Sequence, residues 1–202
     1  MCDPNDLIII NELQRGTGAT ELPTDPEVIR ETNELYLTHL MSQIRRVGLD
    51  APQLGSTRME NASRNTRNMR AVADIFENSP QRQWVREQAH NVDLDSLNPR
   101  TFQELLIGLF QEGGVTWERV LVLFYFCTDL SIRALQERIA GCFIRIYYWT
   151  TCYISGRLAY WIQQQGGWAA ILPSSRISNL SIVGICIAGA IALCLVVRNI
   201  RK

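Results

Sequence analysis

The sequence is poor in the residues and motifs on which catalysis and metal binding depend. It has only two histidines, His39 and His90, and neither is spaced with cysteine or carboxylate residues as metal ligands usually are. No GxxxxGKS/T, GxGxxG or GxSxG motif occurs, and the pairs Gly113-Gly114 and Gly166-Gly167 are typical of helix ends. We therefore expect no enzymatic activity, no metal site and no cofactor, and we expect both histidines at the surface or in helix packing.

Cysteine motifs and an excess of basic charge are also missing. The six cysteines form no CxxC pair, which is typical of a reducing compartment and argues against a disulfide framework or a zinc site. Because Arg198, Arg201 and Lys202 are three of the 20 basic residues, the rest of the chain carries 17 basic against 20 acidic residues. A mildly acidic body argues against nucleic acid as the main partner.

The sequence does have a long apolar stretch near its middle, from Val115 to Gln136. Between Arg119 and Asp129 it contains VLVLFYFCT, which offers no polar face to water, and a helix that is apolar all round is a buried one. A second mostly apolar stretch, IAGCFIRIYYWTTCYIS, follows and is interrupted only by Arg145. We predict that the two form a hydrophobic helical hairpin inside one all-α bundle of amphipathic helices.

The predicted surrounding helices have clear start and stop signals. Asp25 and Pro26 begin a helix that ends at Gly48, and Asn98 and Pro99 begin another. A shorter helix is expected around Trp84, Val85 and Ala89, and short helices are expected on both sides of Gly166-Gly167. The apolar stripes are Val28, Leu35, Tyr36, Leu40 and Ile44 in the first helix, and Phe102, Leu105, Leu106, Leu109 and Phe110 in the second.

A further amphipathic helix is predicted over residues 59–78, closed by Ser79-Pro80. Its stripe steps by three and four residues. The stripe consists of Met59, Ala62, Thr66, Met69, Ala73 and Phe76, with Val72 beside it. Most such stripes serve only packing, and Asp74, which follows the small Ala73, is the one feature that hints at a further role.

The C-terminal segment from Ile177 to Val197 is uncharged and strongly apolar. A helix of about 20 residues covers the ~30 Å hydrocarbon core of a bilayer, so we predict a C-terminal transmembrane anchor; the alternative is a buried C-terminal helix. The N-terminal residues do not resemble a secretory signal peptide. The expected organisation is a flexible arm over 1–24, a helical domain over 25–174 and an anchor over 175–202.

Two motifs resemble the homology regions of the Bcl-2 apoptosis regulator family. LFQEGGVTWERVLVLFYF (109–126) resembles the first region and WIQQQGGW (161–168) the second; their order, their separation by two apolar helices and the C-terminal anchor agree with the family. Within the family, LFYFCTDLSIRAL is most similar to the Bax/Bak effector branch.

The resemblance implies a third homology region in the helix over 59–78. The family pattern is a leucine, three residues, a small residue and an aspartate, and Met69, Ala73 and Asp74 stand at these positions, with Val72 and Phe76 as further anchors. Met69 departs from the leucine and Ala73 from the usual glycine. In the first region Glu118 replaces a glycine that lets a ligand helix approach closely.

The resemblance also implies a groove that receives an apolar helix from another protein. Arg119 would pair with an acidic residue of the ligand, or would instead pair within the chain, with Asp74 or Glu118. The second region would close one end of the groove or else provide ordinary core and cap residues. The implied groove residues are Phe110, Trp117, Glu118, Arg119, Val120 and Leu123, and those of the second region are Trp161, Gly166, Gly167 and Trp168.

The leading functional expectation is a pro-apoptotic effector that oligomerises through helix-in-groove contacts and permeabilises the mitochondrial outer membrane, with a possible cytosolic inactive pool. Its partners would be other members of the family, further copies of itself and membrane lipid. One alternative is a pro-survival member that sequesters the exposed third-region helices of effectors. Another is a tail-anchored adaptor without a role in cell death, which would leave both motifs unexplained.

Overall fold

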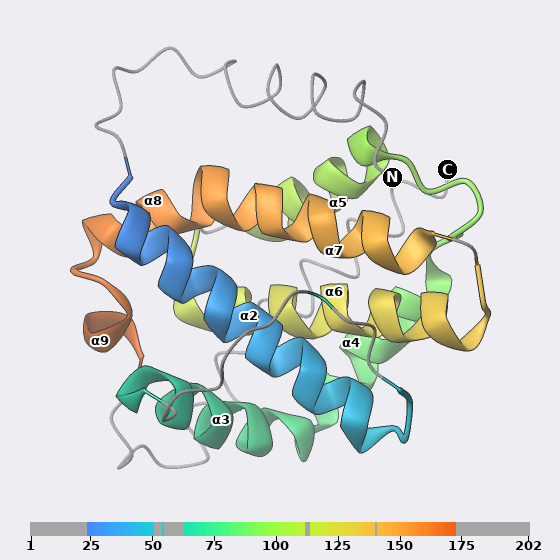
Figure 1. Ribbon diagram of the computed structural model, residues 1–202, viewed down its shortest axis with the longest axis horizontal. Coiled ribbons are helices and arrows are strands. Elements are labelled where there is room, and N and C mark those ends of the chain that lie inside the picture. The colour runs from blue at the N-terminus through green and yellow to red at the C-terminus, as the bar shows by residue number, and fades with distance from the viewer. Residues whose placement is uncertain (1–23, 51–53, 55–62, 112–113, 140, 173–202) are drawn as a thin grey trace.

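A computed structural model describes residues 24–50, 54, 63–111, 114–139 and 141–172 of the chain. All regular elements in these ranges are helical, which confirms the all-α prediction (Figure 1). The helices are α2 (Pro26–Arg46), α3 (Arg64–Glu77), α4 (Pro80–Asn91), α5 (Pro99–Gln111), α6 (Trp117–Gln136), α7 (Cys142–Tyr153), the π-helical η1 (Ile154–Leu158), α8 (Ala159–Gln164) and α9 (Trp168–Ile171).

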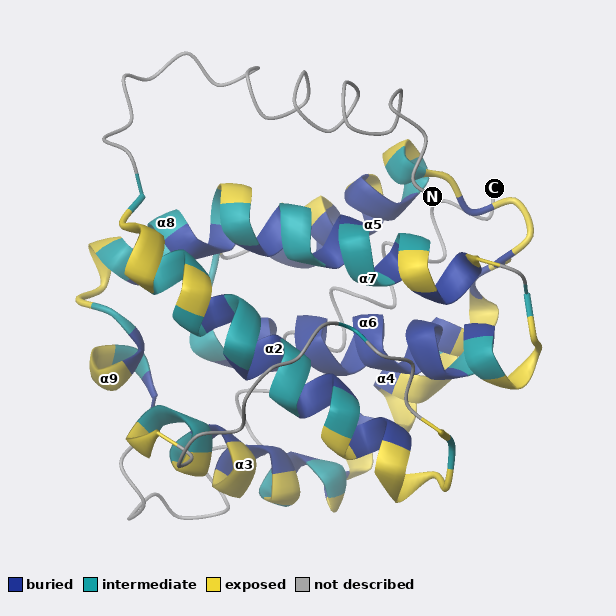
Figure 2. Cartoon of the chain, in the orientation of Figure 1, coloured by how far each residue is buried: buried dark blue, intermediate teal, exposed yellow. Residues whose placement is uncertain are grey.

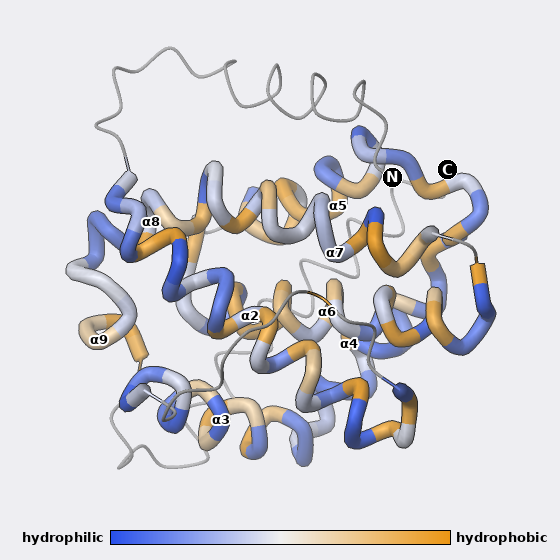
Figure 3. Tube along the Cα trace, in the orientation of Figure 1, coloured by the Kyte–Doolittle hydropathy of each residue, from blue (hydrophilic) through white to orange (hydrophobic). Residues whose placement is uncertain are grey.

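The central helix of the bundle is α6, as its sequence predicts. Figure 1 shows α6 running through the middle, and α2, α4, α5 and α7 pack against it. The helix is buried on all sides (Figure 2) and lies among the apolar parts of the chain (Figure 3). Burial extends beyond the apolar run, because Glu118, Arg119 and Asp129, which we expected as charged flanks, are also buried.

The predicted helix caps on the amphipathic helices are confirmed where the structure describes them. The Asp25 side chain accepts the backbone N–H of Glu27 at 2.8 Å, and Asn98 accepts that of Thr101 at 3.0 Å. Gly48 has a φ of 73°, a conformation that glycine adopts without strain at the end of a helix. The caps fix where α2 and α5 begin, and so which residues of each helix face α6.

The second apolar helix differs from the expectation of a hairpin enclosed on all sides. The face of α7 toward α6 is buried, but Ile144 is 41% exposed and Tyr147 and Tyr148 are half-buried. The helical path continues through the π-helical turn η1 into α8, and Asn33 of α2 donates to the Ser155 hydroxyl within η1 at 3.0 Å. The side of α7 that faces away from α6 can carry exposed apolar residues, because one packed apolar face is enough to hold a helix in a bundle.

The shorter helix predicted around Trp84, Val85 and Ala89 exists as α4. Val85 and Ala89 are fully buried, whereas Trp84 is 41% exposed. Gln81 and Arg82 complete the buried face one turn before Val85. They share this face because they lie four and three residues from Val85.

Several predictions fall outside the described residues. These are the arm over 1–24 apart from its last residue, residues 59–62 of the helix predicted over 59–78, and the anchor between Ile177 and Val197. Within the described residues that helix begins later than predicted, because the Ser63 side chain caps α3 by accepting the backbone N–H of Thr66 at 3.1 Å. Among the helices that the structure does describe, none combines the length and the apolar character that crossing a bilayer requires.

Candidate helix-binding site

Helix α3, which carries the predicted third-region residues, packs against the rest of the domain through its apolar stripe. Met69, Val72, Ala73 and Phe76 are all buried, and the Phe76 ring centroid lies 5.0 Å from that of Tyr125 in α6. Asp74 is exposed on the other side of α3. The anchors that would be offered to a partner thus hold α3 in its own fold, and of the five predicted third-region residues only Asp74 is exposed.

Arg119 lies at the start of α6 and is only 8% exposed. Its Nη1 donates to the backbone oxygen of Leu109, near the end of α5, at 3.0 Å. Within the described residues it forms no ion pair with Asp74 or Glu118, so the intramolecular pairs that we considered from the sequence are absent. The guanidinium instead satisfies a carbonyl of the last turn of α5, where a cation is favourable.

The other predicted groove residues are not equally accessible. Val120 and Leu123 are fully buried in the core, Phe110 is buried with its ring 6.4 Å from that of Tyr153, and Trp117 is half-buried. In this conformation the structure therefore brings Phe110, Trp117 and Arg119 to the α5–α6 junction but leaves Val120 and Leu123 beneath the surface.

The second-region residues form the turn between α8 and α9. Gly166 and Gly167 have φ values of 89° and 84°, which non-glycine residues rarely adopt. This turn places Trp168 in the core, where its Nε1 donates to the Thr32 hydroxyl of α2 at 2.9 Å. Trp161 is half-buried. The motif therefore ties the end of the domain to α2.

A buried charge cluster that we did not predict from the sequence lies at the C-terminal end of α3. Arg82 of α4 and Asp129 of α6, 5% and 6% exposed, form a two-pronged ion pair with distances of 2.6 and 2.7 Å. The Arg82 Nε also donates to Glu77 of α3 at 2.9 Å. Burial raises the pKa of the Asp129 carboxyl, and the Arg82 guanidinium opposes that rise. Arg82 and Asp129 both lie on the buried faces of their helices. Their spacing from the apolar residues of those faces was the one sequence signal that could have identified them as buried.

Tyr125 connects this cluster to the interior. Its hydroxyl donates to the Ala73 carbonyl of α3 at 2.8 Å, and the Arg82 guanidinium carbon lies 4.6 Å from its ring centroid. The His39 ring of α2 packs edge-on against the same tyrosine, with centroids 4.4 Å apart. Burial, together with the nearby Arg82 charge, lowers the pKa of His39 to about 3, so its imidazole is neutral. His39 thus serves helix packing, one of the two roles expected of it.

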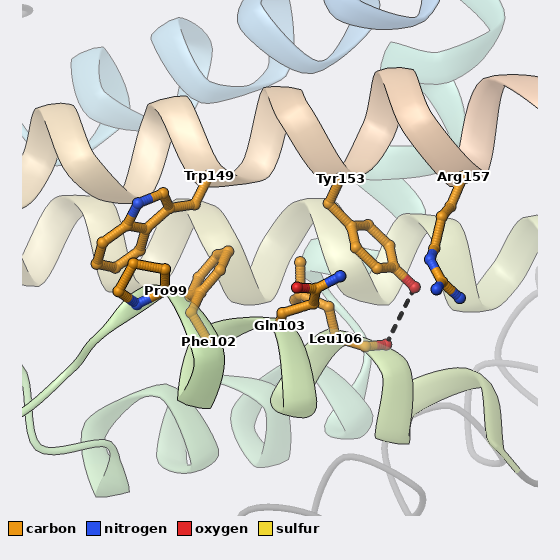
Figure 4. A pocket seen from close by; sticks show the side chains of 7 residues that line it. All are labelled: Pro99, Phe102, Gln103, Leu106, Trp149, Tyr153 and Arg157. Carbon is orange, nitrogen blue, oxygen red and sulfur yellow. Dashed lines mark hydrogen bonds between the residues drawn. The ribbon is translucent and has the colours of Figure 1, made fainter. Parts of the chain in front are cut away.

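A small cleft lies between α5 and the α7–η1 helix (Figure 4). Pro99, Phe102, Leu106, Trp149 and Tyr153 form its apolar walls, with Gln103 and Arg157 as polar members. Its cavity of about 10 Å³ has room for roughly one water molecule. The Gln103 Oε1 and Trp149 Nε1 atoms have no hydrogen-bond partner within the described residues. A cavity of this size is too small for a cofactor.

The described ranges also contain no set of three histidine, cysteine or carboxylate side chains close enough to hold a metal ion. Burial raises the pKa of the Cys127 thiol to about 12, so this thiol is protonated in the core. The polar side chains of the clusters described above therefore make contacts between helices.

The chain is similar to a known protein family and to individual members of it. The family described as apoptosis regulator proteins, Bcl-2 family, matches residues 69–168, a range that begins in α3 and ends at Trp168. Apoptosis regulator BAX from cattle and from human is each 29% identical over 188 residues, covering 92% of this chain and 95% of the relative. The chain belongs to the Bcl-2 family of apoptosis regulators.

Within the Bcl-2 family the similarity is uneven. Bcl-2-like protein 1 from chicken is 32% identical, but over only 69 residues, or 34% of this chain and 30% of that protein. The similarity to BAX extends over nearly the whole of both chains and supports the Bax-like branch.

Proposed function

We propose that this protein is a pro-apoptotic effector of the Bcl-2 family. It is held in the mitochondrial outer membrane by residues 177–197, with a cytosolic inactive pool, and on activation it releases α3, dimerises helix-in-groove with a second copy and permeabilises the bilayer. The observation that carries the proposal is the similarity to BAX over 92% of the chain. Other family members bind through the same helix-in-groove contact.

The way in which α3 is held supports its release. Only four of its 14 residues are buried, whereas 16 of the 20 residues of α6 are. The area that α3 must uncover is correspondingly small, at ~25 cal/mol per Å² of apolar surface. An effector can therefore free α3 while the α6 core remains intact.

Arg119 and Asp74 are the proposed register points of the dimer. Asp74 is exposed before activation, and Arg119 is held by the Leu109 carbonyl, a neutral partner that a carboxylate would replace. Losing one partner of a buried charge pair costs ~3–5 kcal/mol and a rim pair ~1 or less. Arg119→Ala should therefore weaken binding of a 59–78 peptide well beyond tenfold if the pair is buried, and unchanged affinity by calorimetry would remove Arg119 from the site.

Dye release from liposomes tests the effector function. Met69→Glu places a charge on the buried stripe of α3, which is costly to bury unpaired in the closed fold or in the partner's groove. Ala71→Glu is the matched control, because it adds the same single negative charge at an exposed position of α3. We expect dye release by peptide-activated wild type and by Ala71→Glu, and none by a folded Met69→Glu variant.

The outcome also separates the effector from the alternative of a pro-survival family member. Release by a folded Met69→Glu protein contradicts the helix-export mechanism. No release by activated wild type, with binding of the 59–78 peptide retained, favours a protein that captures the helices of effectors.

Truncation tests the proposed anchor. Removing residues 177–202 should leave a folded domain, because residues between 24 and 172 form a buried core that joins all the described helices. That domain should no longer sediment with mitochondria. If the truncated protein still resists carbonate extraction, another part of the chain holds the protein in the membrane.

A further inference from the structure

The ion pairs around Arg82 join three helices at a single buried guanidinium. Both Nη atoms bond to Asp129 of α6, and the Nε bonds to Glu77, the last residue of α3. Arg82 itself belongs to α4. Because one planar guanidinium provides all these donors in fixed directions, α3, α4 and α6 are held in a single mutual orientation.

Tyr125 adds a second connection one turn earlier on α6. Its hydroxyl bonds to the Ala73 carbonyl and its ring lies under the Arg82 guanidinium. Only two kinds of polar bond in this group therefore cross from α6 to the α3–α4 pair: the Arg82–Asp129 ion pair and the Tyr125–Ala73 hydrogen bond. The bonds of Glu77 to Arg82 and Arg86 stay within the α3–α4 pair.

We propose that Glu77, Arg82, Tyr125 and Asp129 form an autoinhibitory charge clamp that makes α3 and α4 leave α6 together. Opening α3 alone would pull Glu77 away from a buried arginine, and opening α4 alone would break the same contact from the other side. Opening the pair as one unit keeps Glu77 bonded to Arg82 and breaks the bonds to Asp129 and Tyr125. It also breaks the bonds from Arg133 of α6 to the Ala89 and His90 carbonyls of α4, and the bond from Asn65 of α3 to Glu31 of α2. The clamp thus sets the threshold for exposing the third-region helix, and this inference rests on the proposed function.

Hydrogen exchange of the full-length protein tests the clamp directly. Asp129→Asn removes the buried negative charge that holds Arg82, so amides of α3 and α4 should exchange at least about tenfold faster, and by the same factor in both helices. Amides at the α6–α7 contact should keep their wild-type rates. Glu104→Gln is the matched control, since Glu104 pairs with Arg100 on the exposed face of α5, and should change neither helix.

A conservative variant covers the case in which Asp129→Asn does not fold. Arg82→Lys keeps the positive charge beside Asp129 but cannot bond to both Asp129 oxygens and Glu77 at once. We expect α3 and α4 to exchange at least about threefold faster in this variant, again together. Faster exchange in α3 without α4, equal acceleration in all helices, or no acceleration would each overturn the clamp.

Peptide-triggered dye release keeps this result separate from the proposed function. If the protein is an effector, Asp129→Asn should reach half-maximal release with about tenfold less of the 59–78 peptide than wild type, in line with the exchange result. Selective exchange without dye release from any variant would support the clamp and contradict the effector function. Dye release with uniform exchange would support the effector and overturn the clamp.

Discussion

α6 and α3 both contribute side chains to one core, but they are held in different ways. α6 is buried on every side by α2, α4, α5 and α7, whereas α3 has one buried stripe and an exposed face that carries Asp74 (Figure 2). The apolar packing of α6 is spread over many neighbours, while α3 depends on a few anchors and on the bonds of Tyr125 and Arg82. The difference indicates that one fold can keep a permanent core and a detachable helix.

Shortening a buried side chain of α6 should lower the free energy of unfolding the most. Phe124 is fully buried and packs against the rings of Tyr36 and Trp168, so Phe124→Ala should lower the free energy of unfolding by about 3–5 kcal/mol. Urea denaturation followed by circular dichroism measures this change. A loss below that of Val72→Ala in α3 would contradict the comparison between the two helices.

Acid should weaken the α2–α6 contact through His39. Folding lowers the pKa of His39 from 6.5 to about 3, so below pH 6.5 the unfolded chain binds a proton that the folded chain does not. Stability is therefore retained above pH 6.5 and falls toward pH 3, by about 1.4 kcal/mol per pH unit from this group. The unfolding free energies of wild type and His39→Gln should be compared at pH 7 and at pH 5. Because only the part of this range below pH 6.5 contributes, the difference should shift by about 2 kcal/mol in favour of the variant.

The hydrogen bond from α6 to α3 should have an intermediate effect. Tyr125→Phe keeps the ring against Phe76 and His39 but removes the donor to the Ala73 carbonyl, at a cost of about 1–2 kcal/mol. Tyr160→Phe, which alters a half-buried tyrosine of α8, is the control. Equal stability of the two variants in urea would show that this bond does not hold α3.

The exposed face of α3 should matter least for stability. Asp74 is exposed, so Asp74→Asn should change the free energy of unfolding by no more than about 0.5 kcal/mol. Its effect should appear instead in self-association, because the proposed dimer pairs Asp74 with Arg119. Analytical ultracentrifugation of the activated protein measures this; a destabilised but fully dimerising variant would reverse the assigned role.

Local signals in the sequence were enough to predict most helices. Asp25 and Asn98 predicted caps that the structure contains, and the uninterrupted run within α6 predicted a helix buried all round. These predictions succeed because capping and periodicity act within a few residues of chain.

Contacts between distant segments were not predictable in the same way. Arg82 and Asp129 lie 47 residues apart in the chain, and nothing near either residue in the sequence indicates the other as its partner. Arg119 bonds to a backbone carbonyl, for which no side chain provides a signal. The assignment of Val120 and Leu123 to the groove stays a prediction for an opened conformation.

The sequence by itself determined the all-α class, the central helix, the apolar stripe of α3 and the two motifs that connect the chain to its family, because each depends on residues close together in the chain. Only the tertiary structure decided which charges are buried and what they bind. A charged side chain enters a core only where a partner from another helix meets it, and the packing of α3 and α4 on α6 provides that meeting for Glu77, Arg82 and Asp129.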